Sequence, residues 1–381
     1  MTTARQDMTT ARQDMTTARS VVTAPRLEIR LDRIRHNART LVERLATRGI
    51  SVTGVTKATL GSPEIARELI AAGVVGIGES RVENVEAMRR AGITAPMTLV
   101  RAPMPSQVDR VVAAVDVSCN SETDVLAALS AAAHTQGRDH GVLLMVELGD
   151  LREGILPADL EPVARQVLEL PNLVLRGIGT NLACQSGVSP DQRNMAELSA
   201  LASALEAALG MTLDIVSGGN SANLDWVFAA ADVGRVDNLR LGESILLGCE
   251  PLRRRPIDGL HTDAITLVAE VIESKAKPSK PWGEINQTAF GLQAPAADRG
   301  TTNRVILALG QQDVDSTGLV APAGFEILGA SSDHLVLDAG QEHFPVGSEL
   351  TFQLGYRALL RAMTSPFVGR VFTRASGPTT R

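Results

Sequence analysis

The sequence predicts an α/β protein, in which a (β/α)8 TIM barrel is followed by a C-terminal β-rich domain. The first observation is that short apolar runs alternate with alanine-rich stretches that are each long enough for one helix. Continuous apolar strands that alternate with helices are typical of a parallel sheet, and eight of them are typical of a closed barrel. The eight runs are residues 51–56, 74–78, 97–101, 115–119, 142–147, 173–179, 213–216 and 238–241.

The second observation is that this pattern stops near Gly248. Prolines become frequent after that point, and alternating stretches such as 304–309 and 334–338 replace the helical segments. Such alternation predicts β-strands. We therefore divide the chain into a tail (1–25), a barrel (26–247) and a β-rich domain (248–381). Residues 26–31 also alternate and precede the first helix, so they predict a further strand, which could belong to the barrel or to the β-rich domain.

The helices of the barrel have recognisable ends. Ser62 and Pro63 provide a cap and a first-turn proline ahead of the apolar positions Ile65 and Leu69, and Gly73 follows as a stop. These signals predict a helix from about residue 63 to residue 72.

Composition excludes several classes of protein. The 381 residues carry a net charge of −6, with 44% hydrophobic and 21% charged residues, which is ordinary for a globular protein and unlike a nucleic-acid binder. No apolar run approaches the roughly 20 residues of a membrane span. The three cysteines lack metal-site or disulfide spacing, so we expect a cytoplasmic protein without a structural metal. The polar repeat MTTARQD at the N-terminus predicts a disordered tail.

Lys57 is the only lysine in the first 274 residues, and it ends the first apolar run; the other three are Lys275, Lys277 and Lys280. Arginine stays protonated at any workable pH, whereas a partly desolvated lysine amine can form a Schiff base or take a proton. Lys57 is therefore a candidate for covalent or acid–base chemistry. The alternative is that a strand end simply exposes a lysine tip.

Polar residues follow the other predicted strands, at the barrel end that carries catalytic groups in such folds. Arg152 and Asn181 follow the fifth and sixth strands, and Arg240 lies on the eighth. The turn Ser217-Gly218-Gly219-Asn220-Ser221 after the seventh strand offers backbone N–H groups and a hydroxyl to an anion. A lysine amine, an anion cradle and arginines together match the needs of pyridoxal 5'-phosphate, which has an aldehyde, a phosphate and a ring nitrogen.

With these motifs the chain resembles the fold-type III pyridoxal phosphate family that includes alanine racemase, and it is most similar to the ornithine racemase branch. The resemblance covers about residues 26–368. The segments that carry it are 55–58, 147–154, 216–221, 238–244, 309–313 and 327–335. It implies a homodimeric isomerase that racemises an amino acid, and the ornithine branch implies a basic substrate such as ornithine, lysine or arginine.

The resemblance also implies roles for individual residues. Lys57 would bond the cofactor, Arg240 would donate to its ring nitrogen, and Arg152 would approach its phenolic oxygen or the substrate carboxylate. Ser221 would hold the phosphate with the backbone of Gly242 and Glu243, and Tyr356, the only tyrosine, would reach it. The cofactor-binding set is completed by Asn181, Ser217, Gly219 and Asn220. For Tyr356 the alternative is a packing role in the β domain.

Three positions depart from alanine racemase. Asn181 stands in place of a histidine, Gly61 in place of a tyrosine, and Trp282 in place of the tyrosine that the partner subunit supplies as the second base. Tryptophan cannot act as a base. Racemisation by two bases needs an acid–base group on each face of the substrate. The candidates for the second base are Asp313, Asp333 and His334, which could equally be polar groups of turns and strand edges.

Other functions remain open. A non-catalytic pyridoxal phosphate carrier would consist of the barrel alone, and a decarboxylase would place an acidic residue at the ring nitrogen instead of Arg240. Alanine racemase itself is a further alternative. A cofactor-free racemase could use the thiols of Cys119 and Cys184, although buried cysteines are usually packing residues. We expect acidic residues of the partner's β domain to select a cationic substrate, and the candidates are Glu284, Asp313, Asp315 and Asp333.

Overall fold

The computed structural model describes residues 22–287, 289–291 and 297–374; the repeats of the expected tail lie outside them. Eight parallel strands close into a barrel in chain order. This confirms the predicted fold class. The strands are β2 (Ser51–Val55), β3 (Gly76–Glu79), β4 (Met97–Leu99), β5 (Val117–Asn120), β6 (His140–Met145), β7 (Leu173–Gly179), β8 (Ile215–Ser217) and β9 (Asn238–Leu241).

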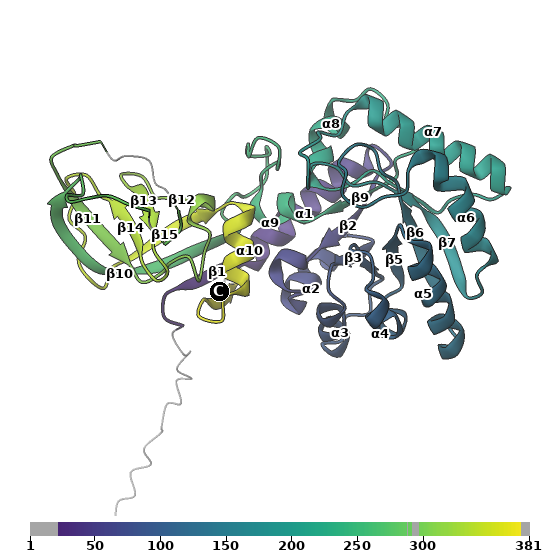
Figure 1. Ribbon diagram of the computed structural model, residues 1–381, viewed down its shortest axis with the longest axis horizontal. Helices are drawn as coiled ribbons and strands as arrows, with labels where there is room; N and C mark the ends of the chain where they lie inside the picture. The colour runs from purple at the N-terminus through teal and green to yellow at the C-terminus, as the bar shows by residue number, and fades with distance from the viewer. Residues whose placement is uncertain (1–21, 288, 292–296, 375–381) are drawn as a thin grey trace, which may run out of the picture.

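Helices surround the barrel and bury one apolar face each against it (Figure 1). The predicted helix signals hold at α2, where the Ser62 hydroxyl accepts a hydrogen bond from the backbone N–H of Ile65 and Pro63 is the first helical residue. The helices are α1 (Leu31–Ala46), α2 (Pro63–Ala71), α3 (Val82–Arg90), α4 (Val108–Ala114), α5 (Thr123–Gln136), α6 (Leu160–Glu169), α7 (Gln192–Leu209), α8 (Leu224–Ala229) and α9 (Glu243–Leu247).

A second, largely antiparallel sheet of eight strands forms the other part of the molecule. Its strands are β10 (Ile265–Pro278), β11 (Thr301–Leu307), β12 (Leu319–Val320), β13 (Glu326–Ala330), β14 (Leu335–Asp338), β15 (Glu349–Leu354), β1 (Arg26–Arg30) and β16 (Gly369–Thr373). The N-terminal strand β1 pairs with β10 and with β16, so residues 26–30 lie in this sheet and not in the barrel. Alternate residues Leu27 and Ile29 are fully buried there.

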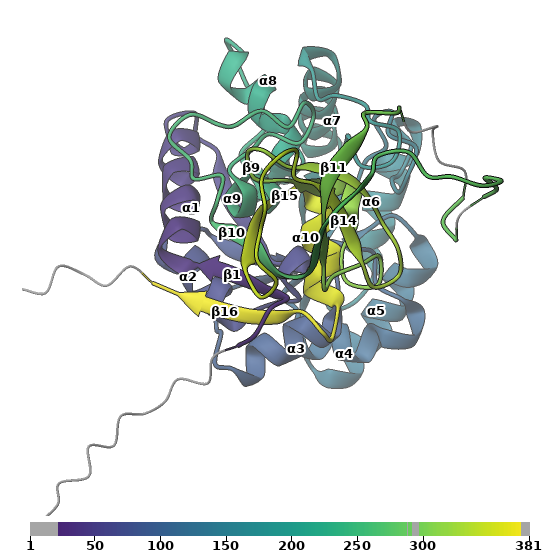
Figure 2. The same cartoon turned by 90° about the vertical axis from the view of Figure 1, so that its left-hand side faces the viewer.

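One helix lies in the part of the chain after Gly248, where we expected alternating strands in place of helices. Helix α10 (Tyr356–Thr364) buries Ala358, Leu359, Ala362 and Met363, and it contacts the turn η1 (Lys57–Thr59) that follows β2. Figure 1 places α10 between the β domain and the barrel, and in Figure 2, which is seen from the side of the β domain, α10 overlaps the centre of the barrel. The helix therefore brings the C-terminal part of the chain to the end of the barrel where the strands terminate.

Among the residues that the structure describes, no helix is both long enough and apolar enough to cross a membrane.

Candidate active site

Lys57 begins a short 3-10 turn directly after β2, at the C-terminal end of the barrel. The turn closes with Leu60 and Gly61 at positive φ, 53° and 62°. A Cβ at Gly61 would lie 2.7 Å from the Cβ of Asn84, so there is no space for a larger side chain. The positive φ also favours glycine over any residue with a side chain. This explains physically why a glycine occupies the position where alanine racemase has a tyrosine.

The surroundings of Lys57 lower the pKa of its amine. Burial is the main cause, and the positive charges of Arg152 and Arg240 act in the same direction, whereas Cys184 and Glu79 oppose them. A lysine with a lowered pKa is more often neutral, which is the form that acts as a nucleophile or base.

Glu79 supports the turn from beneath. Its fully buried carboxylate accepts hydrogen bonds from the Thr56 hydroxyl at 3.0 Å and from the backbone N–H of Ser80 at 2.6 Å. Burial raises the pKa of Glu79. The carboxylate thus fixes the residue before Lys57 to the end of the neighbouring strand β3.

Arg240 lies on β9 with only 6% of its surface exposed. Its guanidinium donates hydrogen bonds to the Ser217 hydroxyl and, at 2.7 Å, to the carbonyl oxygen of Thr180. Burial lowers its pKa. Within the described part of the chain no ion pair joins it to a carboxylate. A buried cation that is held only by neutral groups suits an acceptor such as a ring nitrogen.

The turn after β8 is tightly constrained. Asn220 and Asn223 cap the 3-10 turn η4 (Ser221–Asn223) through reciprocal side-chain hydrogen bonds. Gly219 has a φ of 136°, and a Cβ there would lie 2.4 Å from the Asn223 side-chain oxygen. The Ser221 hydroxyl accepts a hydrogen bond from the backbone N–H of Ser244 at 3.2 Å. The turn thereby joins the start of α9, beside Gly242.

These groups enclose a cavity of about 270 Å³, near the lower end of the roughly 300–1,000 Å³ of small-molecule sites. Of the residues that we predicted to bind a cofactor, those that line it are Lys57, Arg152, Asn181, Asn220, Ser221, Arg240, Gly242, Glu243 and Tyr356. Ser217 and Gly219 do not line it. Ser217 supports Arg240, and Gly219 shapes the turn before Ser221.

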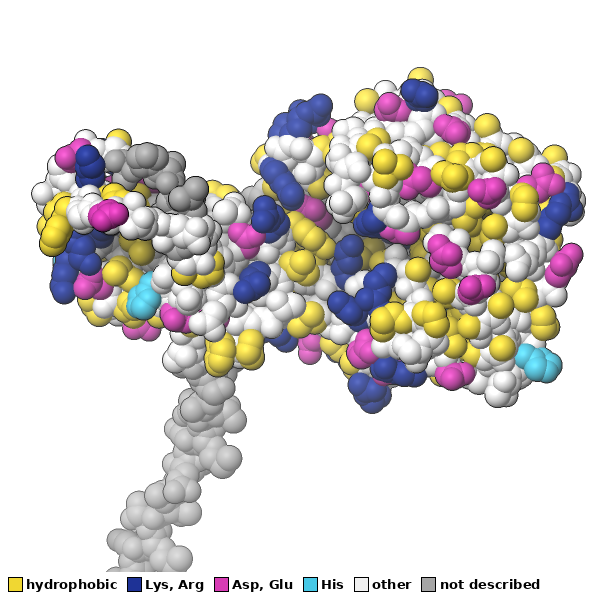
Figure 3. All heavy atoms as spheres, in the orientation of Figure 1, with side chains coloured by type: hydrophobic (Ala, Val, Ile, Leu, Met, Phe, Trp, Pro, Cys, Tyr) yellow, Lys and Arg dark blue, Asp and Glu magenta, His cyan; other side chains and the backbone are white. Residues whose placement is uncertain are grey.

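A wider hollow of about 1,410 Å³ adjoins the cavity and is lined by residues of the barrel, of the β domain and of α10. Lysine and arginine side chains gather where the two parts meet (Figure 3). Arg81, Arg101, Arg357 and Arg361 all line the hollow, and the buried Nε atom of Arg101 has no hydrogen-bond partner among the residues that the structure describes. Helix α10 supplies Arg357 and Arg361, which sequence reasoning missed. The helical spacing of Ala358, Leu359, Ala362 and Met363 was the available signal.

The three candidates for the second base do not line either space in their own chain. Asp313 is 9% exposed, and its carboxylate accepts a 2.8 Å hydrogen bond from the Ser365 hydroxyl, next to the end of α10. Asp333 and His334 are exposed, with Asp333 accepting from the Gln312 amide. A role for these residues would therefore have to be in a partner's site, and it stays a prediction.

Comparisons with known proteins agree with this architecture. The family model "Alanine racemase, N-terminal domain" matches residues 29–251. A lysine racemase of Thermotoga maritima is 39% identical over 91% of this chain and 98% of its own length. An ornithine racemase of Acetoanaerobium sticklandii is 38% identical over 90% of this chain and 98% of its own length.

The fold is also that of solved alanine racemases. The enzyme from D-cycloserine-producing Streptomyces lavendulae superposes with a TM-score of 0.72 at 22% identity, over 92% of this chain and 98% of that one. The alanine racemase of Streptomyces coelicolor superposes with a TM-score of 0.73 at 20% identity, over 91% and 97%. The chain belongs to the alanine racemase family.

Proposed function

We propose that this protein is a pyridoxal phosphate-dependent racemase of basic amino acids, with ornithine and lysine as its substrates. The observation that carries the proposal is the 270 Å³ cavity, which brings Lys57 together with Arg240 and the Asn220–Ser221 turn. The near-full-length likeness to a lysine racemase and an ornithine racemase supports the substrate class.

The donor set of the cavity fits this cofactor. Lys57 would hold its aldehyde, Arg240 its ring nitrogen, and Ser221 with the Gly242 backbone its phosphate, and Tyr356 lines the same cavity. The fit rests on chemistry: an amine with a lowered pKa, a buried guanidinium that is held by a hydroxyl and a backbone carbonyl oxygen, and a hydroxyl beside a fixed turn. When bound, the cofactor would withdraw electrons from the substrate's α-carbon and make its proton acidic.

In this proposal, side chains of the protein remove and return the α-proton of the substrate. The Lys57 Nζ atom takes the α-proton on one side of the substrate and returns it, which requires the neutral amine. The charge on Arg240 disfavours protonation of the ring nitrogen, which moderates electron withdrawal and favours rapid return of the proton over side reactions. This preference separates the proposal from a decarboxylase.

The substrate side chain would be selected by carboxylates. Three carboxylates line the two spaces, and each is already paired with an arginine: Glu153 with Arg152, Asp315 with Arg357, and Glu243 with Arg254. A buried ammonium needs a partner, because an uncompensated charge costs several kcal/mol. A second subunit would supply that partner from its β domain, with Asp313 and Asp333 as the candidates.

The homodimer is part of the proposal. Within one chain the hollow over Lys57 is open, and the segment between β10 and β11 exposes Trp282 to 93%, Ile285 to 66% and Phe290 to 55%. We infer that these exposed apolar side chains contact the partner subunit.

The function is tested with the purified protein loaded with pyridoxal phosphate and then incubated with single enantiomers of ornithine, lysine, arginine and alanine. Chiral chromatography should show conversion of both ornithine enantiomers and both lysine enantiomers, with a higher kcat/KM than for alanine. Loaded protein that racemises none of them would identify a carrier, release of CO2 would identify a decarboxylase, and a preference for alanine would contradict the substrate class.

A further inference from the structure

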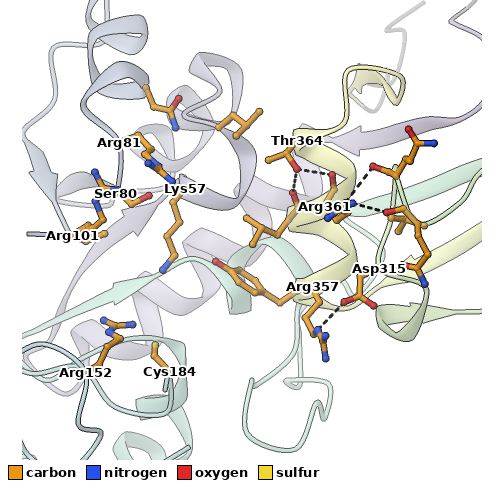
Figure 4. A pocket seen from close by; sticks show the side chains of 18 of the residues that line it. Lys57, Ser80, Arg81, Arg101, Arg152, Cys184, Asp315, Arg357, Arg361 and Thr364 are labelled. Carbon is orange, nitrogen blue, oxygen red and sulfur yellow. Dashed lines mark hydrogen bonds and ion pairs between the residues drawn. The ribbon is translucent and has the colours of Figure 1, made fainter. Parts of the chain in front are cut away.

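We infer that Cys184 is the second acid–base group of this site, acting on the face of the substrate opposite Lys57; the inference rests on the proposed racemase function. Cys184 follows β7 and Lys57 follows β2, so the two side chains enter from different walls of the barrel. Both line the 270 Å³ cavity and the wider hollow. Figure 4 shows them facing the same space, together with Arg152.

The other groups lining these spaces that could exchange a proton are poorly suited. The three carboxylates are paired with arginines. Burial raises the pKa of Tyr356 to about 12, which makes its phenol a weak acid near neutral pH. Trp282, at the position of the family's second base, has an indole N–H that cannot act as a base. Cys184 remains, and a thiol exchanges its proton more readily than a phenol.

The backbone around Cys184 is fixed. The carboxylate of Asp150, 1% exposed, accepts hydrogen bonds from the N–H groups of Cys184 at 3.2 Å, Gln185 at 2.9 Å and Ser186 at 3.1 Å. The Ser186 hydroxyl donates back to the Asp150 carbonyl oxygen at 2.6 Å. A buried carboxylate that binds three consecutive amides holds a reactive side chain in place, as an acid–base site requires.

The sulfur atom of Cys184 is oriented by amides. It accepts hydrogen bonds from the side-chain N–H groups of Asn181 at 3.0 Å and of Asn220 at 3.6 Å. Asn220 also donates to the Asn181 side-chain oxygen at 3.1 Å, so the two amides form one network. Because both amides present donors to the sulfur, its own proton is directed elsewhere. Asn181, which stands where alanine racemase has a histidine, thus holds the thiol of Cys184.

The proton transfers balance over a cycle. In one direction the Lys57 Nζ atom removes the α-proton and the Cys184 Sγ–H group delivers its proton to the α-carbon from the other side, leaving an ammonium and a thiolate. In the other direction the thiolate removes the proton and the ammonium delivers one. Exchange of the two protons with solvent resets the pair after each turnover.

The test uses the holoenzyme with Cys184→Ala and Cys184→Ser, and with Cys249→Ser as the control, since Cys249 is a free thiol that lines neither space. Racemisation should fall by about 10²–10⁴-fold in both Cys184 variants and stay unchanged in the control. In D2O, the Cys184 variants should still exchange the α-hydrogen of one enantiomer with retention of configuration, because Lys57 continues to act on that enantiomer. Exchange from the other enantiomer should fall together with racemisation.

Persistent one-sided exchange also reports that a Cys184 variant is folded and loaded. Racemisation within threefold of wild type in Cys184→Ala would overturn the inference, and so would equal loss of exchange from both enantiomers in a variant that keeps its cofactor absorbance. If the wild-type holoenzyme itself racemises nothing, the proposed function fails instead.

Discussion

The guanidinium of Arg240 donates a 2.7 Å hydrogen bond to the carbonyl oxygen of Thr180, 60 residues earlier in the chain. This contact joins β9 to the residue that follows β7, at the C-terminal end of the barrel strands. Both groups are buried, so the carbonyl has no alternative donor in solvent and the guanidinium is held in one orientation. The position of the charge is therefore built into the barrel itself.

Replacing Arg240 with lysine should lower both the rate of racemisation and the stability of the protein. An ammonium cannot reproduce the planar donor pair, so racemisation should fall about 10²-fold or more, as for other losses of an oriented donor. The free energy of unfolding should fall by about 1–3 kcal/mol, because a buried partner loses its hydrogen bond. Arg165→Lys is the control, since the ion pair of Arg165 with Glu161 is exposed on both sides and contributes little. Full activity in Arg240→Lys would show that the ring nitrogen does not depend on this guanidinium.

The buried His140 should make stability depend on pH. Burial lowers its pKa to about 4, whereas an unfolded histidine titrates near 6.5. Between these values the unfolded chain binds the extra proton, so the stabilisation is complete above about pH 6.5 and is lost as the pH falls to about 4. The loss amounts to at most about 3 kcal/mol.

Urea denaturation at pH 7 and pH 4.5 measures this effect. The difference in unfolding free energy between the two pH values should shrink in His140→Gln, whereas the exposed control His343→Gln should keep the wild-type difference. An unchanged difference in His140→Gln would mean that His140 is protonated in the folded protein.

Asp313 and Asp333 can be compared as substrate selectors. Each should be changed to asparagine and assayed with ornithine, lysine and alanine, with a shift of preference away from the cationic substrates expected. Ser365→Ala is the matched control for Asp313, because it removes the 2.8 Å hydrogen bond and leaves the carboxylate. If both aspartate variants keep the wild-type preference, these residues do not select the substrate. If Asp333→Asn stops turnover of every substrate, Asp333 takes part in proton transfer.

The dimer should depend on the exposed apolar residues after β10. Trp282→Asp combined with Ile285→Asp should weaken association by about 2 kcal/mol or more, roughly 30-fold in Kd, and activity should fall at the same protein concentrations. Val75→Asp is the control, since Val75 is 54% exposed and precedes β3 at the opposite end of the barrel. Analytical ultracentrifugation alongside the assay decides; a fully active wild-type monomer would contradict the shared site.

Much of this architecture could be predicted because the barrel strands are buried on both faces and so appear as uninterrupted apolar runs, as β6 does with six buried residues in a row. The ends of the strands were predicted less accurately. Residues 74 and 75 look like strand, yet β3 begins at Gly76, because hydrophobicity does not show where ladder pairing begins. Helix α10 was not predicted, because a helix of nine residues has few turns in which the 3.6-residue spacing of its apolar positions can be recognised.

The contacts that organise the site could not be predicted. Asp150 lies 34 residues before Cys184, and nothing in the sequence indicates that its carboxylate binds the backbone of that loop. Similarly, Tyr356 reaches the cavity of Lys57 only because α10 contacts the turn after β2. Both depend on tertiary packing, whereas Lys57 itself is marked by its position at a strand end.

The most direct measurement is borohydride reduction of the cofactor-loaded protein followed by peptide mapping. We predict that the cofactor is attached to Lys57, that Lys57→Ala loses both the absorbance band and all racemisation, and that Lys275→Ala keeps both, since Lys275 is exposed and paired with Glu273. A reduced adduct on Lys275, Lys277 or Lys280, or a Lys57→Ala variant that still racemises ornithine or lysine, would contradict it.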